Sequence, residues 1–373
     1  MTAPRVSVLI PTYNRADLIG AAIDSVFAQT FQDFEIIVVD DGSTDDTRDV
    51  IARYGDRVQY LRIDHAGPAP ARNAGFRAAR GEYVCILDSD DLYYPHKLAL
   101  QVAHLDENPD TVMVYTDFSA FDADGFWNEF HLREYHRSAY GPGKRTYSQL
   151  FEEQWPLERD AVLRAAAADH PAWLSRRGYR GHLFDAYLFD TVVFTNSMMF
   201  RRELLPRIGL QNTYFGHFHD LEFALRICKL GKVAFLDNPT YKLRYHPGQV
   251  SSRAGAGGEL NSVRLQRGLL RVARVHGLRD TNYYAAHRQR VDELIARLCR
   301  AAAVPLIAYG GKGRHARKYF PRRARRYLAW CERHGHPMRL LRLVSYLPEL
   351  PKRAFFRLEP LWRRLVRPDV VPT

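Results

Sequence analysis

Two aspartates separated by one residue form the acidic triplet Asp88-Ser89-Asp90, directly after an apolar run. Carboxylate oxygens are the ligands that Mg²⁺ and Mn²⁺ take in proteins, commonly together with the phosphates of a substrate. A divalent cation held there would neutralise the charge that develops on a departing diphosphate. Acidic triplets are also common in turns, so the triplet alone leaves a metal site and a turn open as interpretations.

Other polar residues occupy the same kind of position after two earlier apolar runs. Tyr13 and Asn14 follow a run that stops at Pro11, and Asp40 and Asp41 follow a second run. Short apolar runs bounded by turn residues predict buried strands, and apolar residues at helical spacing between them predict helices. The predicted strands are residues 6–10, 35–39, 58–63 and 83–87, with helices at 18–27, 43–51 and 69–80.

This alternation predicts the fold class. Four strand and helix units in about 100 residues indicate an α/β fold, with a mainly parallel sheet and helices on both faces. In such sheets the ligand lies beyond the carboxyl ends of the strands, where the polar residues fall. The glycine pattern of dinucleotide-binding folds and the P-loop pattern are both absent near these strands, which argues against a dehydrogenase and a P-loop kinase.

The rest of the chain is less regular. Residues 116–190 are rich in aromatic side chains, which suit either an irregular insertion with its own small core or a pocket wall that packs against sugar rings. Regular structure resumes at 195–200, followed by a helix at 220–230 and an extended piece over 233–245. Residues 253–373 look helical almost throughout, and the segments 340–347 and 355–366 are basic and amphipathic, of the kind that lie on a membrane surface.

Charge is unevenly distributed along the 373 residues. The formal net charge is +12, yet residues 251–373 hold 27 Lys and Arg against 8 Asp and Glu, a net of +19. The first 250 residues carry a net charge of −7. This asymmetry indicates an anionic partner for the C-terminal region, such as a phospholipid surface, a lipid-linked phosphate or a nucleic acid. A solvated basic helical surface is the plainer interpretation.

Composition excludes several classes of protein. Hydrophobic residues make up 46% and charged residues 26% of the chain, as in ordinary globular proteins. The four cysteines form no CxxC pair, which argues against zinc ribbons, thioredoxin sites and iron–sulfur clusters. No apolar run is long enough to span a membrane, and the N-terminal run is too short for a signal peptide. We expect a cytoplasmic protein whose basic C-terminal region would contact the inner face of the cell membrane.

Several segments together resemble the family 2 glycosyltransferases of the GT-A fold. VSVLIPTYNR at 6–15, DFEIIVVDDGSTDDT at 33–47 and ARNAGFRAARGEYVCILDSDD at 71–91 carry the most specific resemblance. Residues 195–209 and 219–251 resemble the acceptor-side half of the family. The resemblance covers roughly residues 4–252, and it does not account for residues 120–190 or for the chain after Ser252.

The resemblance implies a nucleotide-binding half. It places Asp41 at the position that hydrogen-bonds the base, typically uracil, and Pro11 and Tyr13 at the lip of the nucleotide pocket. Arg72 and Asn73 fall on the helix near the nucleotide. The donor implied is a nucleotide-diphosphate sugar, most typically a UDP-sugar.

The resemblance also implies a metal site and a catalytic base. Asp90 matches the main metal-binding aspartate, Asp88 a position near the ribose and the metal, and His246 a histidine that approaches the metal or diphosphate. The implied cofactor is Mn²⁺ or Mg²⁺, and imidazole favours Mn²⁺. Asp220 matches the base of the inverting members, although an aspartate at a helix start is also an ordinary N-cap. The family usually has Glu-Asp where this chain has His219-Asp220.

These observations predict a metal-dependent inverting glycosyltransferase acting on a glycan or lipid-linked acceptor in cell-surface polysaccharide synthesis. Residues 1–252 would form the GT-A domain, made of a nucleotide-sugar half (1–115), the aromatic insertion (116–190) and an acceptor half (191–252), with a basic helical region at 253–373. A polyprenyl-phosphate glycosyltransferase is one alternative. A nucleotidyltransferase is disfavoured because PTYNRAD at 11–17 lacks a glycine-rich basic loop. A nucleic-acid-binding protein on a degenerate transferase domain is the alternative of another class, and no RRM, KH or zinc-finger signature supports it.

Overall fold

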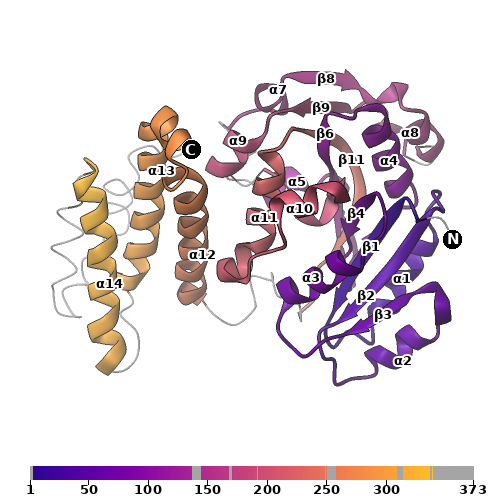
Figure 1. Ribbon diagram of the computed structural model, residues 1–373, viewed down its shortest axis with the longest axis horizontal. Helices are drawn as coiled ribbons and strands as arrows, with labels where there is room; N and C mark the ends of the chain where they lie inside the picture. The colour runs from indigo at the N-terminus through magenta and orange to yellow at the C-terminus, as the bar shows by residue number, and fades with distance from the viewer. Residues whose placement is uncertain are drawn as a thin grey trace. The chain divides into compact units, whose positions relative to one another are not determined.

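A computed structural model describes the chain over residues 3–136, 144–167, 170–190, 192–247, 249, 258–308, 314–336 and 338. The chain divides into two compact units, residues 1–255 and residues 256–373, and each is described by itself (Figure 1). Among the described residues, no helix has both the length and the apolar character needed to cross a membrane.

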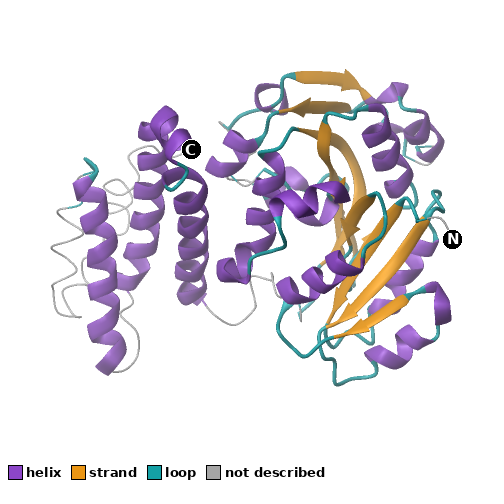
Figure 2. Ribbon diagram, in the orientation of Figure 1, coloured by secondary structure: helices purple, strands orange, loops and turns teal. Residues whose placement is uncertain are grey.

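The first unit is built on one mixed sheet with strand order β3-β2-β1-β4-β10-β6-β11-β9-β8 over the described residues, with β5 added beside β11 and β7 beside β6. Figure 2 shows the strands in orange with helices around them. The strands are β1 (Val6–Thr12), β2 (Phe34–Asp40), β3 (Gln59–Arg62), β4 (Tyr83–Ile86), β5 (Leu92–Tyr93), β6 (Thr111–Asp122), β7 (Gly125–Asn128), β8 (Glu153–Pro156), β9 (Arg177–Gly181), β10 (Met199–Arg201) and β11 (Lys232–Arg244).

Parallel pairing dominates the part of the sheet that was predicted from the apolar runs. β1 pairs in parallel with β2 and β4, and β2 with β3. β10 then runs antiparallel to both β4 and β6, and β11 runs parallel to β6. Strands buried on both faces read as continuous apolar runs, which is why β1, β2 and β4 were visible in the sequence. The predicted α/β fold is confirmed, and its parallel regions are joined by one antiparallel strand.

The helices that the structure describes in the first unit flank this sheet. They are α1 (Ile19–Phe27), α2 (Thr47–Ala52), α3 (Pro68–Ala78), α4 (Lys97–Glu107), α5 (Leu132–Tyr135), α7 (Tyr147–Leu150), α8 (Ala161–Ala166), α9 (Phe184–Phe189), α10 (Leu205–Ile208) and α11 (His219–Cys228). A Pro at the start of α3 suits the first helical turn, because its missing N–H has no partner to lose there. The segment expected to be regular at 195–200 is a 3₁₀ turn, η4 (Thr195–Ser197), followed by β10.

The aromatic-rich segment extends the main sheet instead of forming a separate core. Its strands β8 and β9 pair with each other, and β9 pairs with β11. The rings of Tyr115 and Tyr147 lie 4.9 and 4.6 Å from the ring of Phe235 on β11, and Tyr179 lies 5.3 Å from Tyr147. Tyr147 and Tyr179 are therefore core residues of the first unit, whereas Phe126, Trp127 and Tyr135 of the same segment are exposed.

The described part of the second unit is helical, as the sequence predicted. It contains α12 (Gly258–Ala273), a π-helical turn at Arg274–Leu278, α13 (Thr281–Ala308) and α14 (Arg314–Arg333). α13 packs against both α12 and α14. The apolar residues at helical spacing on α13, among them Val291, Ile295 and Cys299, are fully buried. The two amphipathic segments expected at 340–347 and 355–366 lie outside the described residues.

Candidate active site

The predicted acidic residues gather at the carboxyl edge of the sheet. Asp88 and Asp90 follow β4, and Asp41 follows β2. β11 runs in the same direction as β4, because β10 is antiparallel to β4 and to β6 while β6 is parallel to β11. The carboxyl end of β11 therefore brings His246 to this edge, where its Nε2 lies 3.1 Å from Oδ2 of Asp90.

Arg72 on α3 connects two of the predicted carboxylates. Its Nη2 donates to Oδ1 of Asp88 at 2.9 Å, and its Nη1 lies 4.0 Å from Oδ2 of Asp220. The Arg72 side chain is only 7% exposed. Burial opposes its charge, but the carboxylates of Asp88 and Asp220 outweigh burial and raise the pKa of Arg72. The structure thus brings two predicted carboxylates, Asp88 and Asp220, to the positive charge of a third predicted residue, Arg72.

The 3₁₀ turn η4 supplies two further partners that sequence reasoning did not single out. Thr195 donates from Oγ1 to Oδ2 of Asp220 at 3.1 Å, and Asn196 donates from Nδ2 to Oδ2 of Asp88 at 2.5 Å. Both contacts depend on β10, which inserts this turn beside β4. The resemblance covered residues 195–209, but the segment's letters gave no sign of which side chains turn towards the carboxylates.

A buried polar cluster holds this turn from behind. Lys97 donates from Nζ to the carbonyl of Ser197 at 2.8 Å, and Gln101 donates to the same carbonyl at 2.8 Å. The Ser197 hydroxyl donates to the carbonyl of Thr116 at 2.8 Å. Lys97 is completely buried, and burial lowers its pKa to about 7. Thr195 and Asn196 are thereby presented on a rigid support.

Asp91 completes the acidic segment but faces the interior. Its side chain accepts from the Tyr241 hydroxyl at 2.5 Å and from the Arg244 backbone N–H at 2.7 Å. Burial, followed by the nearby charges of Asp90 and Asp88, raises the pKa of Asp91 well above its usual value. Burial also raises the pKa of Asp88, although Arg72 opposes that change. Asp88, Asp90 and Asp91 therefore lie close enough to influence one another's charge, and burial disfavours the ionised form of Asp91 most strongly.

Asp41 shapes a loop at the nucleotide end of the predicted site. Its two carboxylate oxygens accept the backbone N–H groups of Ala66 and Gly67, each at 2.8 Å. His65 lies beside the same carboxylate and stacks on Tyr13, with ring centroids 4.1 Å apart. Tyr13 is 40% exposed while Asp41 is 3% exposed. The arrangement offers a flat aromatic face beside a buried carboxylate, which suits a planar base.

Two other predicted nucleotide residues lie differently. Pro11, which was predicted at the lip of the nucleotide pocket, is a half-buried residue of β1. Asn73 is buried, and its amide both donates to the Gln211 carbonyl and accepts from the Gln211 N–H, each at 2.8 Å. Gln211 in turn bonds His219 at 2.9 Å through Oε1. Asn73 and His219 thus tie α3 and α11 to the loop between α10 and α11.

The side chains at this edge fit a divalent cation that takes some of its ligands from the protein and the others from a substrate. Asp90 and His246 are in contact, while Asp88 directs one oxygen to Arg72 and the other to Asn196. Across the described residues, no group of three or more His, Cys, Asp or Glu side chains is placed to enclose a metal ion. Magnesium-type sites commonly use one or two carboxylates and complete their shell with waters and phosphates. Oxygen ligands with one imidazole satisfy that chemistry.

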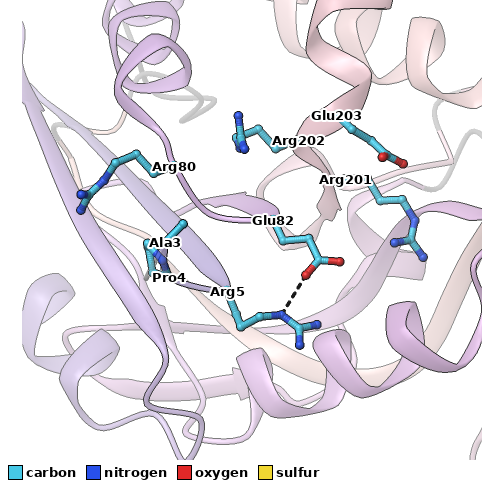
Figure 3. A pocket seen from close by; sticks show the side chains of 8 residues that line it. All are labelled: Ala3, Pro4, Arg5, Arg80, Glu82, Arg201, Arg202 and Glu203. Carbon is cyan, nitrogen blue, oxygen red and sulfur yellow. Dashed lines mark ion pairs between the residues drawn. The ribbon is translucent and has the colours of Figure 1, made fainter. Parts of the chain in front are cut away.

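A second hollow lies near the amino ends of the strands and lacks such chemistry. It has a volume of about 350 Å³ and is lined by Ala3, Pro4, Arg5, Arg80, Glu82, Arg201, Arg202 and Glu203 (Figure 3). Arg5 pairs with Glu82 at 2.9 Å, the contact drawn as a dashed line. Arg80 pairs with Glu35 at 2.7 Å. Four arginines and two glutamates line this hollow, and none of the carboxylates predicted for the site lies there, so the carboxyl edge is the better candidate site.

Comparisons with known proteins point the same way. The sequence model described as Glycosyl transferase family 2 matches residues 7–208. An uncharacterized glycosyltransferase of Rickettsia bellii is 40% identical over 127 residues, which cover 34% of this chain and 18% of that protein. The Escherichia coli protein WfgD, named UDP-Glc:alpha-D-GlcNAc-diphosphoundecaprenol beta-1,3-glucosyltransferase, is 32% identical over 149 residues, covering 39% of this chain and 55% of WfgD. The chain thus spans about a fifth to half of these relatives.

A solved structure shares the fold. Residues 1–349 of S. aureus TarS in complex with UDP-GlcNAc match with a TM-score of 0.52 at 17% identity, covering 96% of this chain and 92% of that one. At that identity the likeness concerns the fold alone.

Proposed function

Because this chain belongs to glycosyl transferase family 2, whose model matches more than half of it, we propose that it moves a sugar from a nucleotide-diphosphate sugar to an acceptor hydroxyl with inversion of configuration. The observation that carries this proposal is the grouping of Asp220, Arg72 and Asp88 at the carboxyl edge of the sheet, beside the Asp90–His246 pair. A single displacement uses a base, here Asp220, and positive charge at the leaving diphosphate. Arg72 holds the base, and Asp90 and His246 would bind a metal ion at the diphosphate.

In the proposed mechanism Asp220 is the base. Its carboxylate accepts the proton of the acceptor hydroxyl while that oxygen attacks the anomeric carbon. The bond from the anomeric carbon to the diphosphate oxygen breaks on the opposite face, and its electron pair leaves with the nucleoside diphosphate. Arg72 and Thr195 hold Asp220 in position through the contacts described above. No covalent enzyme intermediate forms, unlike in retaining glycosidases.

The leaving diphosphate would be stabilised through Asp90 and Asp88. A divalent cation, Mn²⁺ or Mg²⁺, held by Asp90 with Asp88 and His246 would neutralise the charge on the leaving diphosphate. Arg15, whose Nε lies 3.7 Å from Oδ2 of Asp90, adds a positive charge at the same edge. The stacked pair of Tyr13 and His65 would pack against the base, with Asp41 fixing the loop that carries His65.

We propose UDP-sugars as donors and a lipid-linked glycan as the acceptor. The name of the partly matching WfgD supports both choices, since it specifies UDP-Glc and a GlcNAc-diphosphoundecaprenol. The excess of basic residues after residue 250 supports work at the cytoplasmic face of an anionic membrane. Flotation with acidic and with neutral liposomes at two salt concentrations tests the membrane part, because electrostatic binding must weaken as salt rises.

Thermal shift tests the donor site first. UDP, GDP, dTDP and CDP are each added with and without Mn²⁺ to the wild type and to Asp90→Ala. A ligand that binds the folded state raises its melting temperature by mass action. We expect a metal-dependent rise with UDP that Asp90→Ala loses. Each nucleotide is added at roughly 1 mM, about tenfold above ordinary dissociation constants. A wild type whose melting temperature rises with none of the four nucleotides would contradict the proposal.

Transfer itself is then followed with UDP-glucose and α-D-GlcNAc-diphosphoundecaprenol in detergent. Asp220→Asn is expected to keep the UDP response and to lose transfer. The anomeric configuration of the product, read by NMR, distinguishes inversion from retention.

A further inference from the structure

A hairpin beside the candidate active site exposes large aromatic side chains. β7 follows β6 directly, and its Phe126 and Trp127 are 63% and 52% exposed. Successive residues of a strand point to opposite faces. Phe126 accordingly lies near Phe121 and Lys242, with ring centroids 6.0 Å apart for the two phenylalanines. Trp127 turns the other way, towards the end of β11.

Trp127 is fixed in place by two contacts. Its ring stacks on Tyr245 with centroids 4.3 Å apart and an angle of 21° between the planes. Its indole N–H donates to Oδ2 of Asp122 at 2.5 Å. The Tyr245 hydroxyl lies 3.2 Å from Nε2 of the buried His131. One face of the indole is therefore covered by Tyr245, and the other faces solvent. Because the side chain is already fixed, binding a ligand to that face would cost little further side-chain entropy.

The stacked pair is continuous with the catalytic edge. Tyr245 precedes His246, which contacts Asp90 at 3.1 Å. Tyr135, the last residue of α5, is 39% exposed. Its ring packs edge-on against Phe194, the residue before Thr195. The ring of His131 contacts both tyrosines, with centroids 6.0 Å from Tyr245 and 6.2 Å from Tyr135. Ring contacts thus run from the hairpin to Phe194, and the next residue, Thr195, contacts Asp220.

The surrounding charge selects the kind of ligand. Asp122, Asp124 and Glu134 lie on or beside the hairpin, and Asn128 donates to Glu134 at 3.3 Å. Basic groups pack at the opposite face of the hairpin, with Lys242 near Phe126 and Arg244 near Phe121, while the carboxylate of Asp122 bonds Trp127 itself. Sugar rings combine an apolar face, which packs on an aromatic ring, with hydroxyl edges that donate to carboxylates, in keeping with the general make-up of small-molecule sites.

We propose that Trp127, Tyr245 and Tyr135 form an acceptor subsite in which a sugar ring of the acceptor stacks on the free face of Trp127 and its reactive end reaches Asp220. This inference rests on the proposed function, since it names where the acceptor of that transfer lies. The hydroxyls of the stacked sugar would donate to Asp122 or Glu134. Trp127 touches the acceptor but not the reacting atoms, so it determines acceptor binding and not the chemical step.

Three variants of one hairpin test the subsite. Trp127→Ala removes the stacking face, Trp127→Phe keeps a ring while losing the N–H, and Phe126→Ala removes a similar exposed ring that faces the other way. The probes are methyl glycosides of glucose, galactose, mannose, rhamnose and N-acetylglucosamine, with binding measured by saturation-transfer NMR on the UDP-loaded protein. UDP thermal shift on each variant reports the donor site independently.

We expect at least one glycoside to bind the wild type and Phe126→Ala alike. Trp127→Ala should weaken that binding about tenfold or more, as truncation of an aromatic anchor commonly does, and Trp127→Phe should fall between them. The UDP response should stay unchanged in all three variants. In transfer assays Trp127→Ala should raise the KM for the acceptor more than it lowers kcat.

Three results would overturn the subsite. One is equal glycoside binding by the wild type and Trp127→Ala. Another is a wild type that binds UDP and none of the five glycosides. The third is loss of liposome binding in Trp127→Ala with glycoside binding intact, which would assign the hairpin to a lipid surface. Failure of the proposed function looks different, because the wild type would then not respond to UDP at all.

Discussion

Thr195 donates its hydroxyl hydrogen to Asp220, with 3.1 Å between Oγ1 and Oδ2, and so fixes the carboxylate proposed as the base from outside its own helix. Asp220 lies at the start of α11, where its Oδ1 also approaches the N–H of Leu221 at 2.7 Å. One oxygen of the carboxylate is thus used at the helix start and the other is aimed by Thr195 and Arg72. Asp220 is the second residue of α11, whose N-cap is Phe218 with no side-chain cap hydrogen bond, so the N-cap interpretation of Asp220 is wrong.

Replacing this hydroxyl should slow the chemical step. Thr195→Val keeps the shape and removes the donor, and a hydrogen bond to a charged group is worth about 1.5–3 kcal/mol. We expect kcat to fall about ten- to a hundredfold with the donor KM nearly unchanged, and Thr195→Ser to restore most of the rate. Steady-state kinetics with varied donor check this. A fall of equal size in Thr195→Ser would show that only packing is involved.

Removing the charge of Arg72 should destabilise the fold. Its side chain is 7% exposed, and Asp88 and Asp220 would lose their shared counter-charge in Arg72→Met. Breaking a buried ion pair costs about 3–5 kcal/mol, and the two partly exposed carboxylates reduce this to about 2–3 kcal/mol. Urea unfolding measures the free energy. Arg80→Met is the matched control, because Arg80 is 66% exposed and its pair with Glu35 should contribute less than about 1 kcal/mol.

The sequence made the carboxyl edge predictable because β1, β2 and β4 are buried on both faces and read as apolar runs that end in polar residues. The same pattern placed Asp41, Asp88 and Asp90 at one edge of the sheet. The residues that hold these carboxylates were not predictable in this way. Asn196 reaches Asp88 across 108 residues of sequence, through an antiparallel strand of three residues whose pattern carries no such information.

The contacts of the predicted nucleotide-binding residues on α3 were also not predictable from the sequence. Asn73 follows Arg72 on α3, and the family resemblance gave both the same predicted role. On a helix, adjacent residues point about 100° apart. Arg72 therefore meets Asp88 and Asp220, while Asn73 turns to the backbone of Gln211, which lies 138 residues away along the chain. Long-range pairing of this kind is set by the tertiary fold and not by the local pattern.

Asp117 on β6 should make stability depend on pH. Its Oδ1 accepts the N–H groups of Phe118 at 2.7 Å and Leu132 at 2.9 Å, and so anchors the start of α5, which carries Tyr135. Burial, followed by the charge of Asp237, raises the pKa of Asp117 from 3.8 to about 7. The folded protein therefore holds this proton more tightly than the unfolded chain. The stabilisation is complete below about pH 4 and is lost as the pH rises to about 7.

Asp117→Asn removes that titration and keeps the accepting oxygen. Between pH 5 and pH 7.5 the wild type should lose roughly 2–3 kcal/mol of unfolding free energy relative to this variant. Urea unfolding of both proteins across this range gives the difference. Parallel curves over the whole range would show that Asp117 does not titrate there.

Lys97 should act in the opposite direction. Its Nζ is bonded to the neutral groups Gln101 Oε1 and Ser197 O at 2.9 and 2.8 Å, and burial lowers its pKa from 10.5 to about 7. The unfolded chain therefore binds this proton more tightly than the folded protein. The stabilisation is complete above about pH 10.5 and is lost as the pH falls to about 7.

Lys97→Met fills a similar volume without a charge, and Gln101 still donates to the Ser197 carbonyl. The variant should gain roughly 4 kcal/mol relative to the wild type at pH 6 compared with pH 10. The turn that carries Thr195 and Asn196 keeps its remaining bonds from Ser197 to Thr116, so kcat should change by less than the Thr195→Val variant changes it. A stability difference that is constant from pH 6 to pH 10 would show that Lys97 stays charged when folded.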